Sequence, residues 1–298
     1  MFAHQKKVLL LFALLILSIS VACSTSSIPF IGGEPEAEVA PTINPLDLEI
    51  MIAEAAATKV AQTVEAIPTN TVTAIPTETP VPSPTPIPPT NTPTEVDYPN
   101  TGSELEENEG VKIYTDYVGA YTITLPTRWL SLRPGEEEYT EALTLPEASI
   151  PEIQASLLAM ENFDPNTFRL VALDTREGHY NDGFVSNINF VLSEETDASL
   201  EEIFAASVLG LPETLPGVLI TSADIAITSS GVPVAFIVSE RDQVTATGQN
   251  ISIYQKQALF MVKNHSLVIS FTSTLDFKDQ IIEDFDAMVD SFGLLGEE

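Results

Sequence analysis

Cysteine is almost absent from this sequence of 298 residues, which contains only Cys23. A chain with a single cysteine forms no internal disulfide and cannot build a zinc site from several thiolates. It also offers no cysteine nucleophile beyond position 23. The folded part of the chain must therefore be stabilised by its hydrophobic core alone.

Basic residues are also scarce, with 12 Lys and Arg against 43 Asp and Glu and a formal net charge of -31. The acidic residues are spread along the chain and are not gathered in one tail. Nucleic acid is not expected as a partner, because such proteins need a basic surface to neutralise phosphates. The same charge repels anionic lipid head groups, so contact with a membrane requires a covalent anchor.

The short motifs of common enzymes are missing too. The sequence has no GxSxG, no HExxH and no glycine-rich phosphate loop between a strand and a helix. His179 and His265 are the only histidines after the N-terminal segment, and each is isolated in an expected turn. We therefore predict no catalytic residues, no cofactor and a non-enzymatic protein.

Residues 1–22 have the layout of a secretory signal. His4, Lys6 and Lys7 form a basic start, and an apolar run follows from Val8 to Leu17. The run is too short for a comfortable transmembrane helix, which needs about 20 apolar residues. We expect this segment to direct export.

The end of the signal resembles the lipobox of bacterial lipoproteins. It reads Ser20-Val21-Ala22-Cys23 and is followed by polar residues. The resemblance implies a diacylglycerol on the Cys23 sulfur and attachment to the extracytoplasmic side of the cell membrane. Ser20 departs from the large aliphatic residue usual at its position. The alternative is ordinary cleavage after Ala22, which would leave a secreted protein.

Three segments follow the signal before any globular pattern begins. Residues 23–43 are expected to be disordered, and residues 44–67 favour a single helix that either forms part of a stalk or pairs with copies of itself. Residues 68–110 form a linker, rich in Thr and Pro and then in Glu. Its Thr-Pro part favours extended polyproline II, which can span up to ~80 Å.

Strand and helix patterns occupy residues 111–298. Helical periodicity is found at residues 150–163, 199–211 and 276–291. Strands are expected in a hairpin at 112–125 around Gly119, and at 168–174, 184–192, 217–229, 234–246, 250–263 and 267–273. Runs of strands with few helices indicate the α+β class, with an antiparallel β-sheet flanked by helices.

This region resembles the PsbP-like family. The segment Tyr121–Trp129, with sequence YTITLPTRW, is similar to the family's opening strand, Leu-Pro break and following Trp. The strand at Leu267–Thr272, a terminal helix and Ser291-Phe292 are similar to its end. The resemblance implies a PsbP-like α/β/α sandwich, a fold whose members mostly bind partners.

Two places in the sequence are candidate sites of chemistry. Between two strands, hard oxygen donors could hold Ca²⁺, but their spacing fits no EF-hand loop and a solvated turn has the same composition. We predict no metal and keep only weak candidates, Asp174, Glu177 and Asp182, which lie near His179 and Asn181. Trp129, beside Arg128, lies either in the core or in a pocket.

The sequence thus predicts a membrane-anchored, extracytoplasmic lipoprotein that presents a partner-binding domain on a Pro-rich stalk. Its expected partners are the membrane, through the lipid at Cys23, and an envelope or surface protein. The alternative is a small-ligand or solute-binding lipoprotein accessory to a transporter. The oligomeric state is left open.

Overall fold

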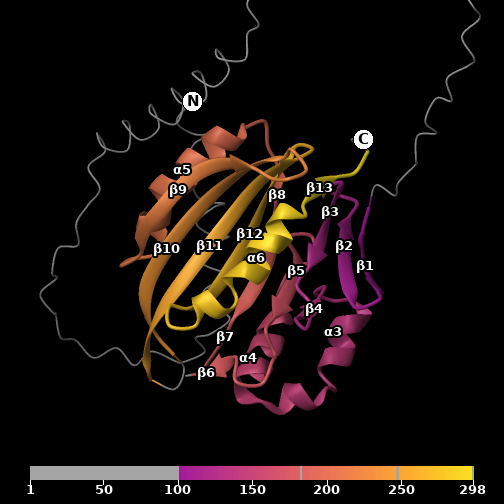
Figure 1. Cartoon of the computed structure of the whole chain (residues 1–298), viewed down its shortest axis with the longest axis vertical. Helices are drawn as coiled ribbons and strands as arrows, with labels where there is room; N and C mark the ends of the chain where they lie inside the picture. Colours follow the sequence, from indigo (N-terminus) through magenta and orange to yellow (C-terminus); the bar gives the residue numbers. More distant parts are fainter. Residues whose placement is uncertain (1–100, 182, 246–247, 297–298) are drawn as a thin grey trace, which may run out of the picture. The chain divides into compact units, whose positions relative to one another are not determined.

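The computed structural model describes residues 101–181, 183–245 and 248–296 (Figure 1). The predicted signal, Cys23, the segments 23–43 and 44–67, most of the linker and Asp182 lie outside these residues. No helix in the described part of the chain is long and apolar enough to cross a membrane.

The predicted linker is wrong at its C-terminal end, because Ser103–Asn108 form strand β1. β1 pairs antiparallel with β2 (Val111–Asp116). Leu105 packs against the main core, while Glu104, Glu106 and Glu107 face solvent. Glu104 and Glu106 thus lie on the face of this edge strand opposite Leu105, and the folded domain begins earlier than residue 111.

A seven-stranded antiparallel sheet forms the centre of the domain, in the order β4-β5-β8-β12-β11-β10-β9. The order along the chain matches the predicted strands, with the short β4 added. The bounds are β4 Leu130–Leu132, β5 Phe168–Leu173, β8 Asn187–Glu195, β9 Leu219–Ile227, β10 Pro233–Val244, β11 Asn250–Val262 and β12 His265–Thr274.

A smaller sheet has the order β1-β2-β3-β13, with β3 at Tyr121–Leu125 and β13 at Gly293–Leu294. The predicted hairpin of β2 and β3 is confirmed. Asp116 closes its turn by accepting hydrogen bonds from the backbone N–H groups of Val118 at 2.9 Å and Gly119 at 3.1 Å. A third, two-stranded sheet joins β6 (Tyr180–Asn181) to β7 (Phe184–Val185).

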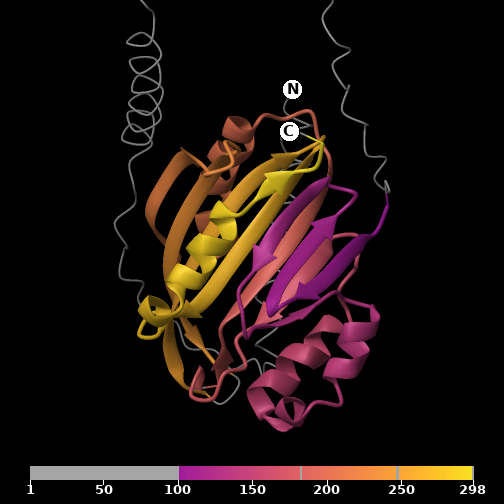
Figure 2. The ribbon, with the colours of Figure 1, turned by 45° about the vertical axis from the view of Figure 1, so that its right-hand side comes forward.

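Helices cover both faces of the large sheet. Figures 1 and 2 show α6 (Ile282–Asp290) on one face with the small sheet beside it, and α5 (Leu200–Thr214) on the opposite face along β9 and β10. Alternate residues of β5 pack on different clusters, so α3 (Glu137–Ala142) and α4 (Pro151–Met160) lie opposite the small sheet. Short 3-10 turns, η1 (Pro146–Ser149) and η2 (Lys278–Gln280), precede α4 and α6.

The main core is aromatic and lies between the large sheet, the small sheet and α6. The Phe292 ring stacks on Phe260 at 3.9 Å and on Tyr121 at 5.2 Å between centroids. Helix α6 contributes Phe285, Met288 and Val289, and Ile281, just before the helix, packs with them. Each such side chain contributes about 1.5–3 kcal/mol when it is buried. The domain is α+β, with antiparallel sheets flanked by helices, as predicted.

Candidate functional site

A buried carboxylate lies where β5 ends. Asp174 is fully buried, and Arg176 donates to both of its oxygens, from Nε to Oδ1 at 2.7 Å and from Nη2 to Oδ2 at 2.7 Å. Nδ1 of His179 lies 2.7 Å from the same Oδ2. The loop after β5 therefore folds around the Asp174 carboxylate, whose negative charge is balanced by a guanidinium.

The Arg176 guanidinium also reaches helix α6. Its Nη2 lies 3.1 Å from Oδ2 of Asp284, and the same oxygen accepts a hydrogen bond from Nε1 of Trp129 at 3.2 Å. The hydrogen bond to Asp174 is the main cause of a raised Arg176 pKa. Trp129 is 1% exposed, which makes it a core residue, whereas Arg128 is exposed. This polar cluster joins three parts of the chain.

The weak metal candidates do not form a common site in the described residues. Both oxygens of Asp174 are already bonded to Arg176, and the Glu177 side chain is exposed. A divalent cation would have to compete with the guanidinium for the same two oxygens. Across the described ranges, no three His, Cys, Asp or Glu residues gather in a way that could hold a metal ion.

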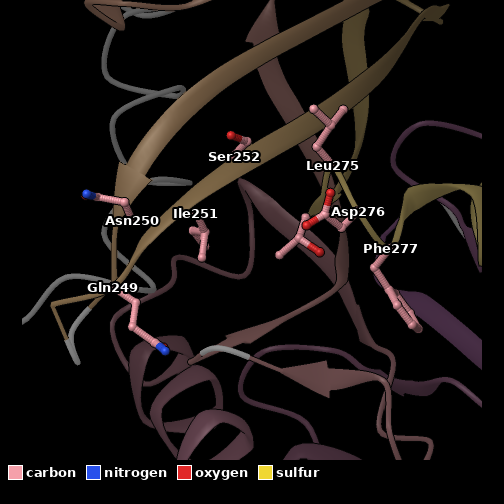
Figure 3. Close-up of a pocket in the computed structure, with 8 residues that line it drawn as sticks. Gln249, Asn250, Ile251, Ser252, Leu275, Asp276 and Phe277 are labelled. Atoms are coloured by element: carbon pink, nitrogen blue, oxygen red, sulfur yellow. The ribbon is translucent and has the colours of Figure 1, made fainter.

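A cavity of about 530 Å³ opens near this cluster, at the start of β11 and just after β12. Figure 3 shows its lining residues on these two neighbouring segments. The antiparallel pairing of Ile253 with Thr274 brings the segments together, and the Leu275 N–H donates to the Ser252 carbonyl at 2.7 Å. The cavity is lined by Gln249, Asn250, Ile251, Ser252, Thr274, Leu275, Asp276 and Phe277.

The cavity lining combines amides, hydroxyls and one carboxylate, that of Asp276, with three apolar side chains. Ser252 donates a hydrogen bond to Asp242 at 2.7 Å. The Phe277 ring packs edge-to-face on the His179 imidazole, with 4.7 Å between centroids, so the cavity adjoins the Asp174 cluster. Such a lining suits a small polar ligand rich in hydroxyl groups or carrying a positive charge.

Sequence reasoning did not identify the cavity. Its lining residues come from two segments that meet only because β11 pairs with β12. No local motif marks them, and each residue type is ordinary at a strand end. The one signal available was the alternation of Asn250 to Val262 and His265 to Thr274, which predicts the hairpin but not the hollow at its end.

A second buried ion pair joins the small sheet to β5. Arg169 donates from Nε to Oδ2 of Asp116 at 2.7 Å, and Tyr114 Oη donates to the same oxygen at 3.0 Å. Burial raises the pKa of Tyr114 well above its usual value, so this hydroxyl remains a neutral donor. Hydrogen bonds among the carboxylate, the guanidinium and the phenol thus hold the two sheets together.

No protein-family model matches the chain, and no curated protein matches it in sequence. Several solved structures are similar to it. Cyanobacterial PsbP (CyanoP) from Synechocystis sp. PCC 6803 is 12% identical with a TM-score of 0.41, and the match covers 63% of this chain and 94% of that one. The Ran-binding protein Mog1p of Saccharomyces cerevisiae is 18% identical with a TM-score of 0.38, over 62% and 95%.

LpqN, which is involved in cell envelope biogenesis of Mycobacterium tuberculosis, is 14% identical with a TM-score of 0.33, over 42% of this chain and 71% of that one. Likenesses of this strength concern the fold alone. We therefore define the class of the domain from its own strand pairing, as an α+β domain with helices on both faces of an antiparallel sheet.

Proposed function

We propose that this protein is a bacterial lipoprotein, attached through Cys23 to the extracytoplasmic side of the membrane, whose α+β domain binds an envelope protein. The observation that carries the proposal is the order of segments: a secretory signal, a lipobox-like Ser20-Val21-Ala22-Cys23, a Thr/Pro-rich stalk and a folded domain. A stalk of this kind gives a tethered domain the reach needed to meet a partner.

The chemistry of the buried polar groups supports a binding role over a catalytic one. In the part of the chain that the structure describes, the fully buried carboxylates are Asp116 and Asp174, and each is hydrogen-bonded by an arginine. A carboxylate that acts as a general acid or base, or as a nucleophile, must reach its substrate, and these two carboxylates are closed off from solvent. Both groups instead hold elements of the fold together.

A lipid anchor on Cys23 would hold the protein on the membrane despite its acidity. Each buried methylene contributes about 0.8 kcal/mol, so two or three acyl chains give stable attachment where one gives only marginal binding. The charge repulsion of the protein by anionic lipid is screened within about 8 Å at physiological ionic strength.

Cell fractionation tests the anchor and the export together. In cells producing the full chain, we expect the protein in the membrane fraction, resistant to high salt and released by detergent. Cys23→Ala should move it to the soluble extracytoplasmic fraction, while Ser26→Ala, a matched change three residues later, should leave it on the membrane. A Cys23→Ala protein that stays membrane-bound contradicts the anchor.

The partner is tested by photocrosslinking in membranes that retain the lipidated protein. We expect a discrete crosslinked protein that is recovered with the wild-type chain and is lost when the domain beyond residue 100 is removed. Recovery that is unchanged without the domain would assign the contact to the stalk and contradict the proposal.

The cavity near Asp276 favours a second candidate function, the binding of a small polar solute. Calorimetric titration of the full chain with neutral oligosaccharides and with small organic cations tests it. Asp276→Asn should abolish or weaken binding, and Asp279→Asn, an exposed acid on the following turn, should not. Equal binding by the two variants would place the ligand elsewhere.

A further inference from the structure

A belt of uncharged polar side chains crosses one face of the seven-stranded sheet, over β8, β12, β11 and β10. Side chains alternate between the two faces along each strand. On β12, Phe271 belongs to the main core, so its neighbours Ser270 and Thr272 lie on the opposite face. The polar belt consists of two adjacent rows of paired residues, Asn189, Ser270 and Gln257 in the first and Asn187, Thr272, Gln255 and Ser239 in the second.

The polar belt lies between apolar side chains on the same face. The row on one side of it is Val191, Val268, Leu259 and Ala235, and none of these is more than 4% exposed. On the other side, Ile253 of β11 packs with Phe184 and Ile251. Five members of the belt are themselves at most 7% exposed, namely Asn189, Ser239, Gln257, Ser270 and Thr272. Positions this buried normally hold apolar side chains.

The hydrogen-bonding groups of the polar belt are only partly used. Gln257 donates from Nε2 to the Ser270 hydroxyl over 3.4 Å. Gln255 donates from Nε2 to the Thr272 hydroxyl, also over 3.4 Å. Within the described part of the chain, the amide oxygens of Asn189, Gln255 and Gln257 accept no hydrogen bond. A buried amide oxygen without a partner destabilises a fold.

These amide oxygens remain within reach of a ligand. Among the described residues, the fully enclosed side-chain atoms that lack a hydrogen-bond partner are Tyr121 Oη and Ser131 Oγ, and neither belongs to the belt. The unpaired oxygens of the belt therefore touch solvent. The fold alone gives no reason for them, because apolar side chains of the same shape would leave no group unpaired. A ligand that donates to these oxygens would offset their cost.

The polar belt leads to the cavity at the end of β12. Ser270, Thr272 and Thr274 lie on one face of that strand, and Thr274 lines the cavity. Two residues of a strand span about 6.6 Å, so Thr272 lies one step inward from the cavity wall. Ile251, which packs with Ile253 beside the belt, lines the same cavity. A molecule that enters the cavity therefore lies next to the belt.

The composition of the polar belt favours a neutral ligand rich in hydroxyl groups. Amides and hydroxyls both donate and accept hydrogen bonds, and so do the hydroxyl groups of a sugar. The belt holds no charge, although the chain has 43 acidic residues, so an ionic ligand would lose its hydration there without meeting a counter-charge. Phe184 and Ile253 beside the belt provide an apolar surface for the C–H face of a sugar ring.

We propose that the polar belt binds a neutral oligosaccharide that enters through the cavity. The inference rests on the second candidate function, solute binding at the cavity, and names the class of solute. Gln255 and Gln257 hold the sugar through their free amide oxygens. A peptide fits less well, because peptides bind sheets by pairing with edge strands. β8, β12 and β11 are central strands, and each is already paired on both sides.

Isothermal titration of the full chain carrying Cys23→Ser with maltotetraose, cellotetraose and chitotetraose tests the proposal. We expect the chain to bind at least one of these sugars. The double variant Gln257→Met/Ser270→Ala removes both partners of one hydrogen bond and should weaken that binding at least tenfold. The same two changes at exposed residues, Gln154→Met/Ser149→Ala, should not. No binding of any of the three sugars, or equal binding by the two double variants, overturns the proposal.

Urea unfolding of the same variants separates a binding role of the belt from a structural one. Gln257→Met/Ser270→Ala replaces both partners of a buried hydrogen bond by apolar groups. Its urea midpoint should therefore be equal to that of the parent chain or higher. A lower midpoint would show that the polar pair stabilises the fold, and it would overturn the proposal.

Two further results distinguish this inference from the solute-binding function on which it rests. Small organic cations that bind and respond to Asp276→Asn, with no sugar bound, would keep the cavity function and overturn the role of the belt. Tetraglycine that binds in place of the sugars, and is lost with Gln257→Met/Ser270→Ala, would assign the belt to a peptide and overturn the carbohydrate class. Binding of neither sugars nor cations would contradict both.

Discussion

The Arg169 side chain connects the two sheets through hydrogen bonds. It is 8% exposed, donates to the fully buried Asp116, and reaches the Pro165 carbonyl with Nη1 at 2.7 Å. Asp116 in turn holds the turn at Gly119 and accepts from Tyr114. Each partner offsets the desolvation of the other, so the pair is sensitive to the loss of either one.

Arg169→Met should destabilise the domain by about 3–5 kcal/mol, because it leaves the Asp116 carboxylate buried without its cation. Urea unfolding followed by Trp129 fluorescence measures the change. Combining it with Asp116→Asn should restore part of the loss, since the uncompensated charge is then removed. If Arg169→Met lowered the free energy of unfolding by less than about 1 kcal/mol, the structural role of the ion pair would be contradicted.

Arg133 and Glu138 form a more exposed pair, with side chains 18% and 22% exposed. Burial alone would raise the pKa of Glu138, but hydrogen bonds from Arg133 and nearby backbone groups outweigh it and lower the pKa. A carboxyl group with a lowered folded-state pKa stabilises the fold above its ordinary pKa. That stability is lost as the pH falls through the lowered value.

Glu138→Gln should therefore cost up to about 1 kcal/mol at neutral pH, a limit set by solvent screening of the pair. The difference from wild type should shrink as the pH falls below about 4.3, the ordinary value for Glu. Thermal unfolding at several pH values measures it, with Glu137→Gln, an exposed neighbour, as the control. A difference that grows on acidification would reverse the predicted sign.

At the residue scale, the sequence allows conclusions from composition, but it does not show which side chains bond to one another. The sequence indicates that Asp174 lies among oxygen donors that could hold a cation. In the structure the cation bound by Asp174 is the guanidinium of Arg176, two residues later. A carboxylate and a guanidinium in one short loop are a signal that was available in the sequence. The sequence alone leaves Trp129 either in the core or in a pocket, and its burial in the structure shows that it is a core residue.

Two glycines show how elements depend on local space. A Cβ on Gly119, in the turn between β2 and β3, would lie 2.8 Å from the ring of the fully buried Tyr121. A Cβ on Gly210, inside helix α5, would meet nothing within 4 Å. The same substitution should therefore have opposite effects at the two positions.

Gly119→Ala should destabilise the domain by about 1–3 kcal/mol, the usual cost of overpacking. Gly210→Ala should stabilise it by about 0.5–1 kcal/mol, because alanine loses less conformational entropy in a helix. Urea midpoints of the two variants measure both effects. A stabilising Gly119→Ala would mean that the turn has room that the structure does not show.

At the element scale, the long strands and helices were predictable because each carries its own period. Helix α5 begins at a capping box between Ser199 and Glu202. The missed elements, among them β1, β4, β6, α3 and β13, are short. β13, for example, forms only by pairing with Tyr121 and Thr122 of β3.

At the scale of the whole molecule, the chain divides into an N-terminal region predicted from composition and a C-terminal domain predicted from periodicity. The α+β class followed from the strand and helix order alone. The cavity beside Phe277 did not, because it depends on which strands become neighbours. Sequence periodicity identifies strands but leaves their order in the sheet open.

The central claim is that Cys23 carries lipid, and metabolic labelling tests it most directly. Cells producing the full chain are fed an alkyne analogue of palmitate, and the purified protein is examined for label. Labelled wild-type protein and unlabelled Cys23→Ala protein are the predicted result. An unlabelled wild-type chain, or equal labelling of the Cys23→Ala chain, would contradict the account.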